Sequence, residues 1–334
     1  MRKFYLIIAI LLFFLLARAQ NSLPYNLESY AQIRFTTDFV KLNNFQLRRL
    51  KFKLTSTPKF LSHWSYYLKF EVKSKNYAIF SLLDARIAYK IDNITFYLGQ
   101  FLPDFSLQRF QSDSKIPTIE RQSLVSNFIP NAGLGKRDVG IQAFYLSENK
   151  LFYTSLGVFN GTGTKQWNFN NNSFLTSHKS FISINKNSNF KLKTGYSLMY
   201  RYAQNLKFKT ILPDSIYFTG KDIRVNAFLQ FSIKNFVFQT EYIKLWLNSW
   251  QTDGFYFLTY YTLRKHQFVF SYEKLQDLNT LTKDLPQFYI GYNYLIDNND
   301  LKISLAYTWQ INNRQIQNSF LSIQLQIFLI RPFS

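Results

Sequence analysis

The chain has 334 residues, a formal net charge of +21 and no cysteine, which excludes a fold held together by disulfides. Aromatic residues make up 19% of the chain and hydrophobic residues 47%, yet the mean hydropathy is slightly negative. Apolar residues are therefore finely interleaved with polar ones, which is typical of the strands of a membrane barrel.

The first residues are typical of a secretory signal peptide. A basic pair precedes an apolar run at 4–16, and residues 17–19 have the small-x-small pattern that signal peptidase reads. A membrane anchor is the alternative, but a spanning helix needs about 20 apolar residues. We therefore expect a signal peptide over 1–19 and a single exported domain over 20–334.

Beyond the first 19 residues there is no second apolar stretch of spanning length, but the sequence alternates with period two. In one such segment, Leu68 and Phe70 share one face, and Lys69 and Glu71 share the other. Alternation of this kind indicates strands rather than helices. Tilted membrane strands need about 9–11 residues. Sixteen segments meet this length, near residues 27–37, 44–55, 64–74, 81–91, 93–101, 136–146, 150–160, 176–185, 190–201, 222–233, 235–246, 254–263, 265–274, 286–296, 300–310 and 318–330.

The connections between these segments alternate in length along the chain. Short ones lie near 91–93 and 233–235, and longer ones near 161–175 and 202–221. Short periplasmic turns that alternate with longer outer loops are typical of bacterial barrels. An even strand count also returns the C-terminus to the side of the N-terminus. The sequence predicts an all-β fold, a transmembrane antiparallel β-barrel of about 16 strands in the bacterial outer membrane.

The longest gap between predicted strands covers residues 102–135. It contains apolar residues that can pack, among them Phe105, Phe110 and Phe128. Loops of this length are usually functional or disordered. We expect a third outer loop that folds into the barrel and narrows it; an extended surface loop is the alternative. The basic residues expected near the narrowest point are Arg109, Lys115 and Arg121.

Barrel geometry turns the alternation into a lipid-facing side and a side that lines the lumen. The charged residues predicted to face the lumen are mostly basic: Arg49, Lys51, Lys53, Lys69, Glu71, Lys73, Asp84, Arg86, Lys90, Lys191, Lys193, Arg201, Arg224 and Lys302. Rings of Lys and Arg favour the passage of anions or phosphate. The alternative is that these charges only solvate a wide wall. We expect an anion pathway formed by Arg48, Arg49, Lys51, Lys53, Lys69, Asp84 and Arg86.

The alternation slips by one residue at Arg48 and Arg49. Leu47 belongs to the odd-numbered apolar series, whereas Leu50 and Phe52 belong to the even-numbered one. A β-bulge inserts one extra residue and would account for the slip. It would also bring two guanidiniums near the lumen, where their planar forks of donors suit oxyanions.

Several short runs resemble the phosphate-selective porin O/P family, and they occur in the same order. They are Leu47–Arg48–Arg49, Leu82–Leu83–Asp84–Ala85, residues 99–107, Glu120–Arg121, Arg137–Asp138 and residues 157–161. The resemblance implies a sixteen-stranded homotrimeric porin with an inward-folded third outer loop. It also implies that Arg48 and Arg49 match a ladder of arginines and that Asp84 matches an acidic site residue. Leu102 and Gln108 depart from the pattern, because many relatives carry Lys and Glu there.

The other classes of function have little support in the sequence. The histidines, His63, His178 and His266, lie on separate predicted strands, so neither a metal site nor another cofactor is predicted. There is no plausible Ser–His–acid set, so we expect no enzyme. Basic residues alternate along the chain instead of clustering, which argues against a nucleic-acid partner. The expected partners are small inorganic anions and outer-membrane lipid. A weakly selective general porin or a structural barrel is the main alternative.

Overall fold

The structure is a computed structural model that describes residues 25–74, 78–129, 137–164, 174–187, 189–208, 211–279, 284–296 and 300–330. The predicted signal peptide at 1–19 lies outside these ranges, as do residues 130–135 of the predicted constriction loop. The cleavage site and the start of the exported domain therefore stay predictions.

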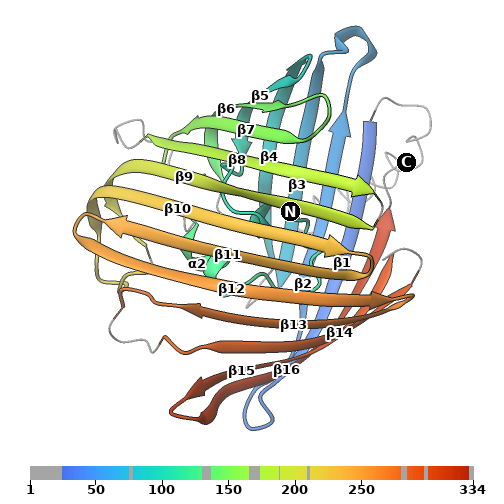
Figure 1. Cartoon of the computed structure of the whole chain (residues 1–334), viewed down its shortest axis with the longest axis vertical. Helices are drawn as coiled ribbons and strands as arrows, with labels where there is room; N and C mark the ends of the chain where they lie inside the picture. The colour runs from blue at the N-terminus through green and yellow to red at the C-terminus, as the bar shows by residue number, and fades with distance from the viewer. Residues whose placement is uncertain are drawn as a thin grey trace, which may run out of the picture.

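In the described residues, sixteen antiparallel strands form one closed barrel (Figure 1). Each strand pairs with its neighbours in the chain, and β1 closes the ring by pairing with β16. The predicted barrel is confirmed. The strands are β1 (Tyr25–Thr37), β2 (Asn43–Ser56), β3 (Trp64–Ser74), β4 (Ala78–Ile91), β5 (Ile94–Phe101), β6 (Asp138–Leu146), β7 (Phe152–Phe159), β8 (Leu175–Asn187), β9 (Phe190–Leu206), β10 (Phe218–Ile233), β11 (Phe236–Leu247), β12 (Trp250–Leu263), β13 (His266–Leu275), β14 (Gln287–Ile296), β15 (Leu301–Asn312) and β16 (Gln315–Ile330).

The period-two alternation separates the two sides of the wall. On β15, Leu305 exposes 44% of its surface on the outside, whereas its neighbour Ser304 and the basic Lys302 are buried on the inside. Apolar side chains on the outer face suit lipid, and polar side chains on the inner face suit a lumen. The same rule built the sixteen predicted segments, which is why they agree with the observed strands.

Two bulges interrupt the alternation in the early strands. Between β1 and β2, Gln32 pairs with Arg49 and Ile33 with Leu47, so Arg48 is the extra residue. The predicted bulge is confirmed.

A second bulge, on β4, was not foreseen. Lys69 pairs with Asp84 and Phe70 with Leu82, so the extra residue is Leu83. Period-two alternation with Ala85 and Ile87 predicts that Leu83 lies on the lipid face. That expectation is wrong, because Leu83 is buried while Leu82 is exposed on the outside. Two adjacent leucines give no sequence signal for which of them occupies the outer position.

The two ends of the barrel differ in the length of their connections. At one end, tight turns join β4 to β5, β10 to β11 and β12 to β13, with positive φ at Asp92, Lys234 and Arg264. The other end carries the longer connections, including the one from β5 to β6. Because β1 and β16 are antiparallel, the first residues of β1 lie beside the last residues of β16.

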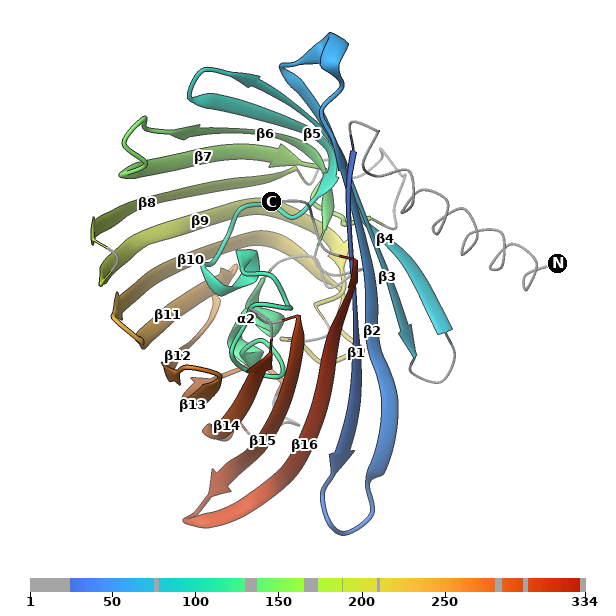
Figure 2. The ribbon, with the colours of Figure 1, turned by 90° about the vertical axis from the view of Figure 1, so that its right-hand side faces the viewer.

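The β5–β6 connection holds short helical turns, η3 (Gln108–Phe110) and α2 (Ser123–Phe128). A further turn, η2 (Lys59–Leu61), joins β2 to β3. Figure 2 shows α2 inside the ring of strands, where it contacts β11, β12 and β13. None of the helices in the described ranges is long and apolar enough to cross a membrane.

Candidate functional site

Residues 102–129 make hydrogen bonds with strands on one side of the barrel. The backbone N–H groups of Leu107 and Gln108 donate to the carboxylate of Glu241 on β11, at 2.8 and 2.7 Å. Farther along the segment, Arg224 on β10 donates from Nη1 to the carbonyl of Phe128 at 2.6 Å. These bonds attach both η3 and the end of α2 to the wall at β10 and β11.

The middle of the same segment is bonded to β14, β15 and β16, which follow β12 and β13 around the ring. The ammonium of Lys302 on β15 donates to the carbonyl of Ile116 at 3.1 Å, and the side-chain amide of Asn293 on β14 donates to that of Pro117 at 2.7 Å. On β16, Gln326 donates to the carbonyl of Ser114 at 3.2 Å. Strands along the arc from β10 to β16 therefore hold one segment.

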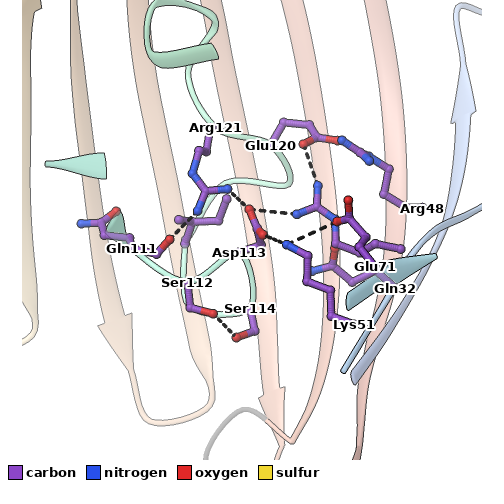
Figure 3. A network of polar contacts seen from close by, with 12 residues as sticks. Gln32, Arg48, Lys51, Glu71, Gln111, Ser112, Asp113, Ser114, Glu120 and Arg121 are labelled. Carbon is purple, nitrogen blue, oxygen red and sulfur yellow. Dashed lines mark hydrogen bonds and ion pairs between the residues drawn. The ribbon is translucent and has the colours of Figure 1, made fainter. Parts of the chain in front are cut away.

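Asp113 of this segment forms ion pairs with the basic side chains of β2 (Figure 3). Its Oδ1 lies 2.9 Å from Nη1 of Arg49, and its carboxylate also pairs with Lys51 and with Arg121. Lys51 in turn pairs with Glu71 on β3 at 3.3 Å. One loop carboxylate is thus shared by three cations.

Glu120 is the second loop carboxylate at this place. It lies 2.8 Å from Nη1 of Arg34 and 3.2 Å from Nη2 of Arg49, and it also pairs with Arg48. Asp113 and Glu120, with Arg34, Arg48, Arg49, Lys51 and Arg121, are called the ion-pair clamp below.

The electrostatics of Glu120 follow from these neighbours. Burial inside the barrel raises the pKa of its carboxyl, but the guanidiniums of Arg48, Arg49 and Arg34 outweigh burial and lower the pKa to about 2. Although 41% of the Glu120 side chain is exposed, this exposure is to the interior of the barrel. Glu120 is therefore ionised at neutral pH and holds the three arginines in place.

A cavity of about 610 Å³ lies between the segment and strands β1 to β4. Among its described lining residues, eight are basic and three are acidic. The basic ones are Lys51, Lys53, Lys69, Arg86, Arg109, Lys115, Arg121 and Arg137, and the acidic ones are Glu28, Asp84 and Asp113. This cavity is called the basic cavity below. Because cations are crowded here, its potential is positive.

A second cavity, of about 410 Å³, lies beside the first. Arg34 and Glu120 of the clamp line it, and Arg121 lines both cavities. The ion-pair clamp therefore stands at the border between the two spaces.

The structure brings the ten predicted site residues together. Eight of them line the basic cavity, namely Lys51, Lys53, Lys69, Asp84, Arg86, Arg109, Lys115 and Arg121. The other two, Arg48 and Arg49, belong to the ion-pair clamp, which shares Lys51 and Arg121 with the cavity. What these residues do in transport is a separate question from where they lie.

Several site residues were missed from the sequence. Arg137 binds Asp84 through two contacts of 3.1 and 3.2 Å, and Arg34 binds Glu120. Alternation along β1 could have placed Arg34 on the inner face. For Asp113, also missed, no periodic signal exists, because it lies in a loop.

Other predicted lumen cations lie elsewhere. On the far wall, Arg201 and Arg224 both bind Asp222, at 2.8 and 2.7 Å, and all three side chains are buried. Lys73 binds Glu71 at 2.6 Å. These cations are compensated by carboxylates and take no part in the basic cavity. In the described ranges, no three His, Cys, Asp or Glu side chains gather in a way that could hold a metal ion.

Comparison with protein families gives one match. The sequence model of the family described as phosphate-selective porin O and P matches residues 28–244, which is more than half of the chain. A search of curated protein sequences finds no significant match.

Solved structures of similar fold are outer-membrane barrels. Salmonella typhi OmpF in complex with daunomycin superposes with a TM-score of 0.66 at 8% identity, covering 91% of this chain and 97% of that one. Pseudomonas putida OprB at high pH gives 0.66 at 10% identity, with 91% and 94% covered. The trimer form of OmpT from Vibrio cholerae gives 0.55 at 11% identity, with 91% and 98% covered. At these identities the similarity shows the fold alone.

Proposed function

Because this chain belongs to the phosphate-selective porin O and P family, we propose that it passes small anions by passive diffusion, inorganic phosphate among them. The family and the fold are those of an outer-membrane channel rather than of an enzyme. A channel needs no chemical step. Its lining must replace part of the hydration of the ion and still release it.

One observation carries the anion preference: the eight basic and three acidic residues that line the basic cavity. The charged side chains of Lys69 and Arg86 line this space from the wall, and Lys115 adds a third positive charge from the loop. In a confined lumen the effective dielectric constant is nearer to about 20 than to that of bulk water. Cations are therefore repelled more strongly than they would be at an open surface.

We also propose that residues 102–135 form the constriction loop. The support is that its described part is hydrogen-bonded to β10 and β11 and is joined by the ion pairs of Asp113 to β2, which lies eight strands from β10 around the ring. A segment held from both sides of a ring narrows the space within it.

A weakly selective general porin is the second candidate, and the ion-pair clamp favours it. Arg34, Arg48 and Arg49 are close to Glu120, and Asp113 offsets Arg49 and Lys51. If ions pass mainly beside the clamp, they meet cations whose charge is partly offset by Asp113 and Glu120. If they pass through the basic cavity, they meet excess positive charge. The measured selectivity distinguishes the two candidates.

The assembly that we propose is a homotrimer in outer-membrane lipid. Its support is the family and the trimer form of a barrel of similar fold. Cross-linking of the purified protein in detergent, before and after heating, tests it: a band at three times the monomer mass is expected, and a monomer at every cross-linker concentration would contradict it.

The function is tested with the purified protein in a planar lipid bilayer. In a potassium chloride gradient, the reversal potential should have the sign of chloride preference, and added phosphate should reduce the chloride current. Lys69→Gln should weaken the preference, while Lys265→Gln, which removes the same charge from an exposed turn, should leave it unchanged. A wild-type channel that prefers potassium would overturn the proposal.

A further inference from the structure

Arg86 is held in the basic cavity by aromatic rings. Its guanidinium carbon lies 4.4 Å from the ring centroid of Tyr67 and 3.9 Å from that of Tyr97. Tyr67 is on β3 and Tyr97 on β5, the two strands that flank β4, so the rings approach from opposite neighbours. Cation–π contacts of this kind hold a guanidinium without neutralising it. They also use none of its N–H donors.

Arg86 also forms no ion pair with a carboxylate of the described residues, although Asp84 in the same cavity acts on it at longer range. None of the ion pairs between described residues includes Arg86, Lys69 or Lys115. In contrast, Lys53 pairs with Glu28 at 3.1 Å, and Arg137 pairs with Asp84 at 3.1 Å. Two kinds of cation therefore line the basic cavity: those that form ion pairs with carboxylates and those that face the open space.

The same cavity has an apolar element. Phe110, from η3, lines it and leaves 45% of its surface exposed, and Leu102 lines it nearby in the chain. An exposed aromatic ring inside a polar lumen offers contact area that a small inorganic anion cannot use.

The size of the cavity fits an organic molecule. Pockets for small organic ligands span about 300–1,000 Å³, and a water molecule takes about 30 Å³ of liquid volume. At about 610 Å³, the basic cavity lies within the first range and is far larger than one inorganic ion requires.

We propose that the basic cavity binds organic carboxylates that carry an aromatic group. The N–H edge of Arg86 receives the planar carboxylate, since two parallel N–H donors match its two oxygens. Phe110 packs against the aromatic group, and Lys69 and Lys115 contribute positive charge at longer range. The inference rests on the proposed function, because the ligand must reach the cavity through an open channel.

The experiment compares two carboxylates of equal charge as inhibitors of the chloride current of the full chain in a bilayer. Benzoate should halve the current at a concentration about tenfold lower than acetate, the factor expected for removing a phenyl ring from water. Phe110→Ser should bring benzoate close to acetate. Arg86→Lys keeps the positive charge but loses the two parallel N–H donors, so it should weaken inhibition by both benzoate and acetate. Lys265→Gln is the matched control and should change neither.

The possible outcomes distinguish a failure of this inference from a failure of the proposed function. Equal inhibition by benzoate and acetate in a channel that prefers chloride would overturn the aromatic carboxylate site and leave the anion channel standing. Inhibition by inorganic phosphate at a lower concentration than benzoate, unaffected by Phe110→Ser, would also overturn it. A preference for potassium in the same recording would instead overturn the proposed function. Because Phe110 is half exposed in a loop, its variant is expected to fold, and a normal open-channel current verifies this.

Discussion

The guanidinium of Arg49 on β2 and the carboxylate of Asp113 in the β5–β6 connection are joined by an ion pair of 2.9 Å, and both side chains are buried. The pair links the wall to the segment that crosses the barrel. Removing one partner of a buried pair leaves an uncompensated charge, which is more damaging than losing the pair itself.

The first prediction concerns this link. Asp113→Asn keeps the size of the side chain but leaves Arg49, Lys51 and Arg121 without their shared carboxylate. We expect the loop to loosen, the unfolding temperature in detergent to fall and the chloride preference to increase. Asp92→Asn, in an exposed turn, is the control and should have no effect. An unchanged unfolding temperature and selectivity for Asp113→Asn would show that the clamp does not hold the loop.

The second prediction concerns pH. The pKa of Glu120 is lowered from 4.5 to about 2, since its arginine neighbours outweigh burial. A carboxyl with a lowered pKa contributes stability that is fully present above its ordinary pKa and is lost as pH falls through its folded-state pKa. Single-channel conductance should therefore stay constant from neutral pH down to about 4 and change only as pH approaches about 2.

Glu120→Gln imitates the protonated form and should show the altered conductance already at neutral pH. A conductance change centred between about pH 4 and 5 in the wild type would mean that Glu120 has an ordinary pKa and that the clamp is weaker than the structure implies.

The strands could be predicted because two solvents impose a strict alternation on them. Lipid outside and water inside force every second residue to be apolar, and Leu305 beside Ser304 shows the result. The rule fails where the backbone breaks the period. It located the bulge at Arg48, where apolar residues change parity, but not the one at Leu83, where both adjacent residues are leucine.

The site could be predicted only in part. The wall cations could be placed by alternation, and the loop cations by their place in the longest gap. The carboxylates Asp113 and Glu120 were missed because pairing between loop and wall depends on how the loop folds, which no periodicity encodes. The alternation therefore predicts that the lumen is lined mostly by basic residues, but not that Arg48 and Arg49 are paired with Glu120 and Asp113.

The third prediction tests which face meets lipid. Leu305→Arg places a charge on the outer face of β15, near the middle of the strand, and should destabilise the barrel by about 2–4 kcal/mol. Lys69→Gln on the inner face should cost little, since no ion pair between described residues includes Lys69. Equilibrium unfolding in detergent or lipid gives both values. The reverse ranking would contradict the assignment of the two faces.

The fourth prediction concerns the width of the channel. Deleting residues 112–118 removes Asp113 and the carbonyls of Ser114, Ile116 and Pro117, which receive hydrogen bonds from β14, β15 and β16. Single-channel conductance should rise, because the segment no longer spans the interior. A conductance equal to that of the wild type would show that this loop does not narrow the pore.

The last prediction concerns the arginines of the ion-pair clamp. Changing Arg48 and Arg49 together to Gln removes two positive charges and leaves Glu120 with Arg34 as its remaining cation in the clamp. The reversal potential in a potassium chloride gradient should move toward zero, because two positive charges are lost and Glu120, now paired with Arg34 alone, is less screened from passing cations.

Adding Glu120→Gln to that variant should restore part of the chloride preference, since it removes the same carboxylate. Residues that act as one network couple in this way, so the effect of Glu120→Gln should be larger without the two arginines than with them. In the intact clamp, three arginines already screen the carboxylate from passing ions. Equal effects of Glu120→Gln in both backgrounds would mean that Arg48 and Arg49 act on ions independently of Glu120. Arginines of a ladder that is not compensated by carboxylates would behave in this way.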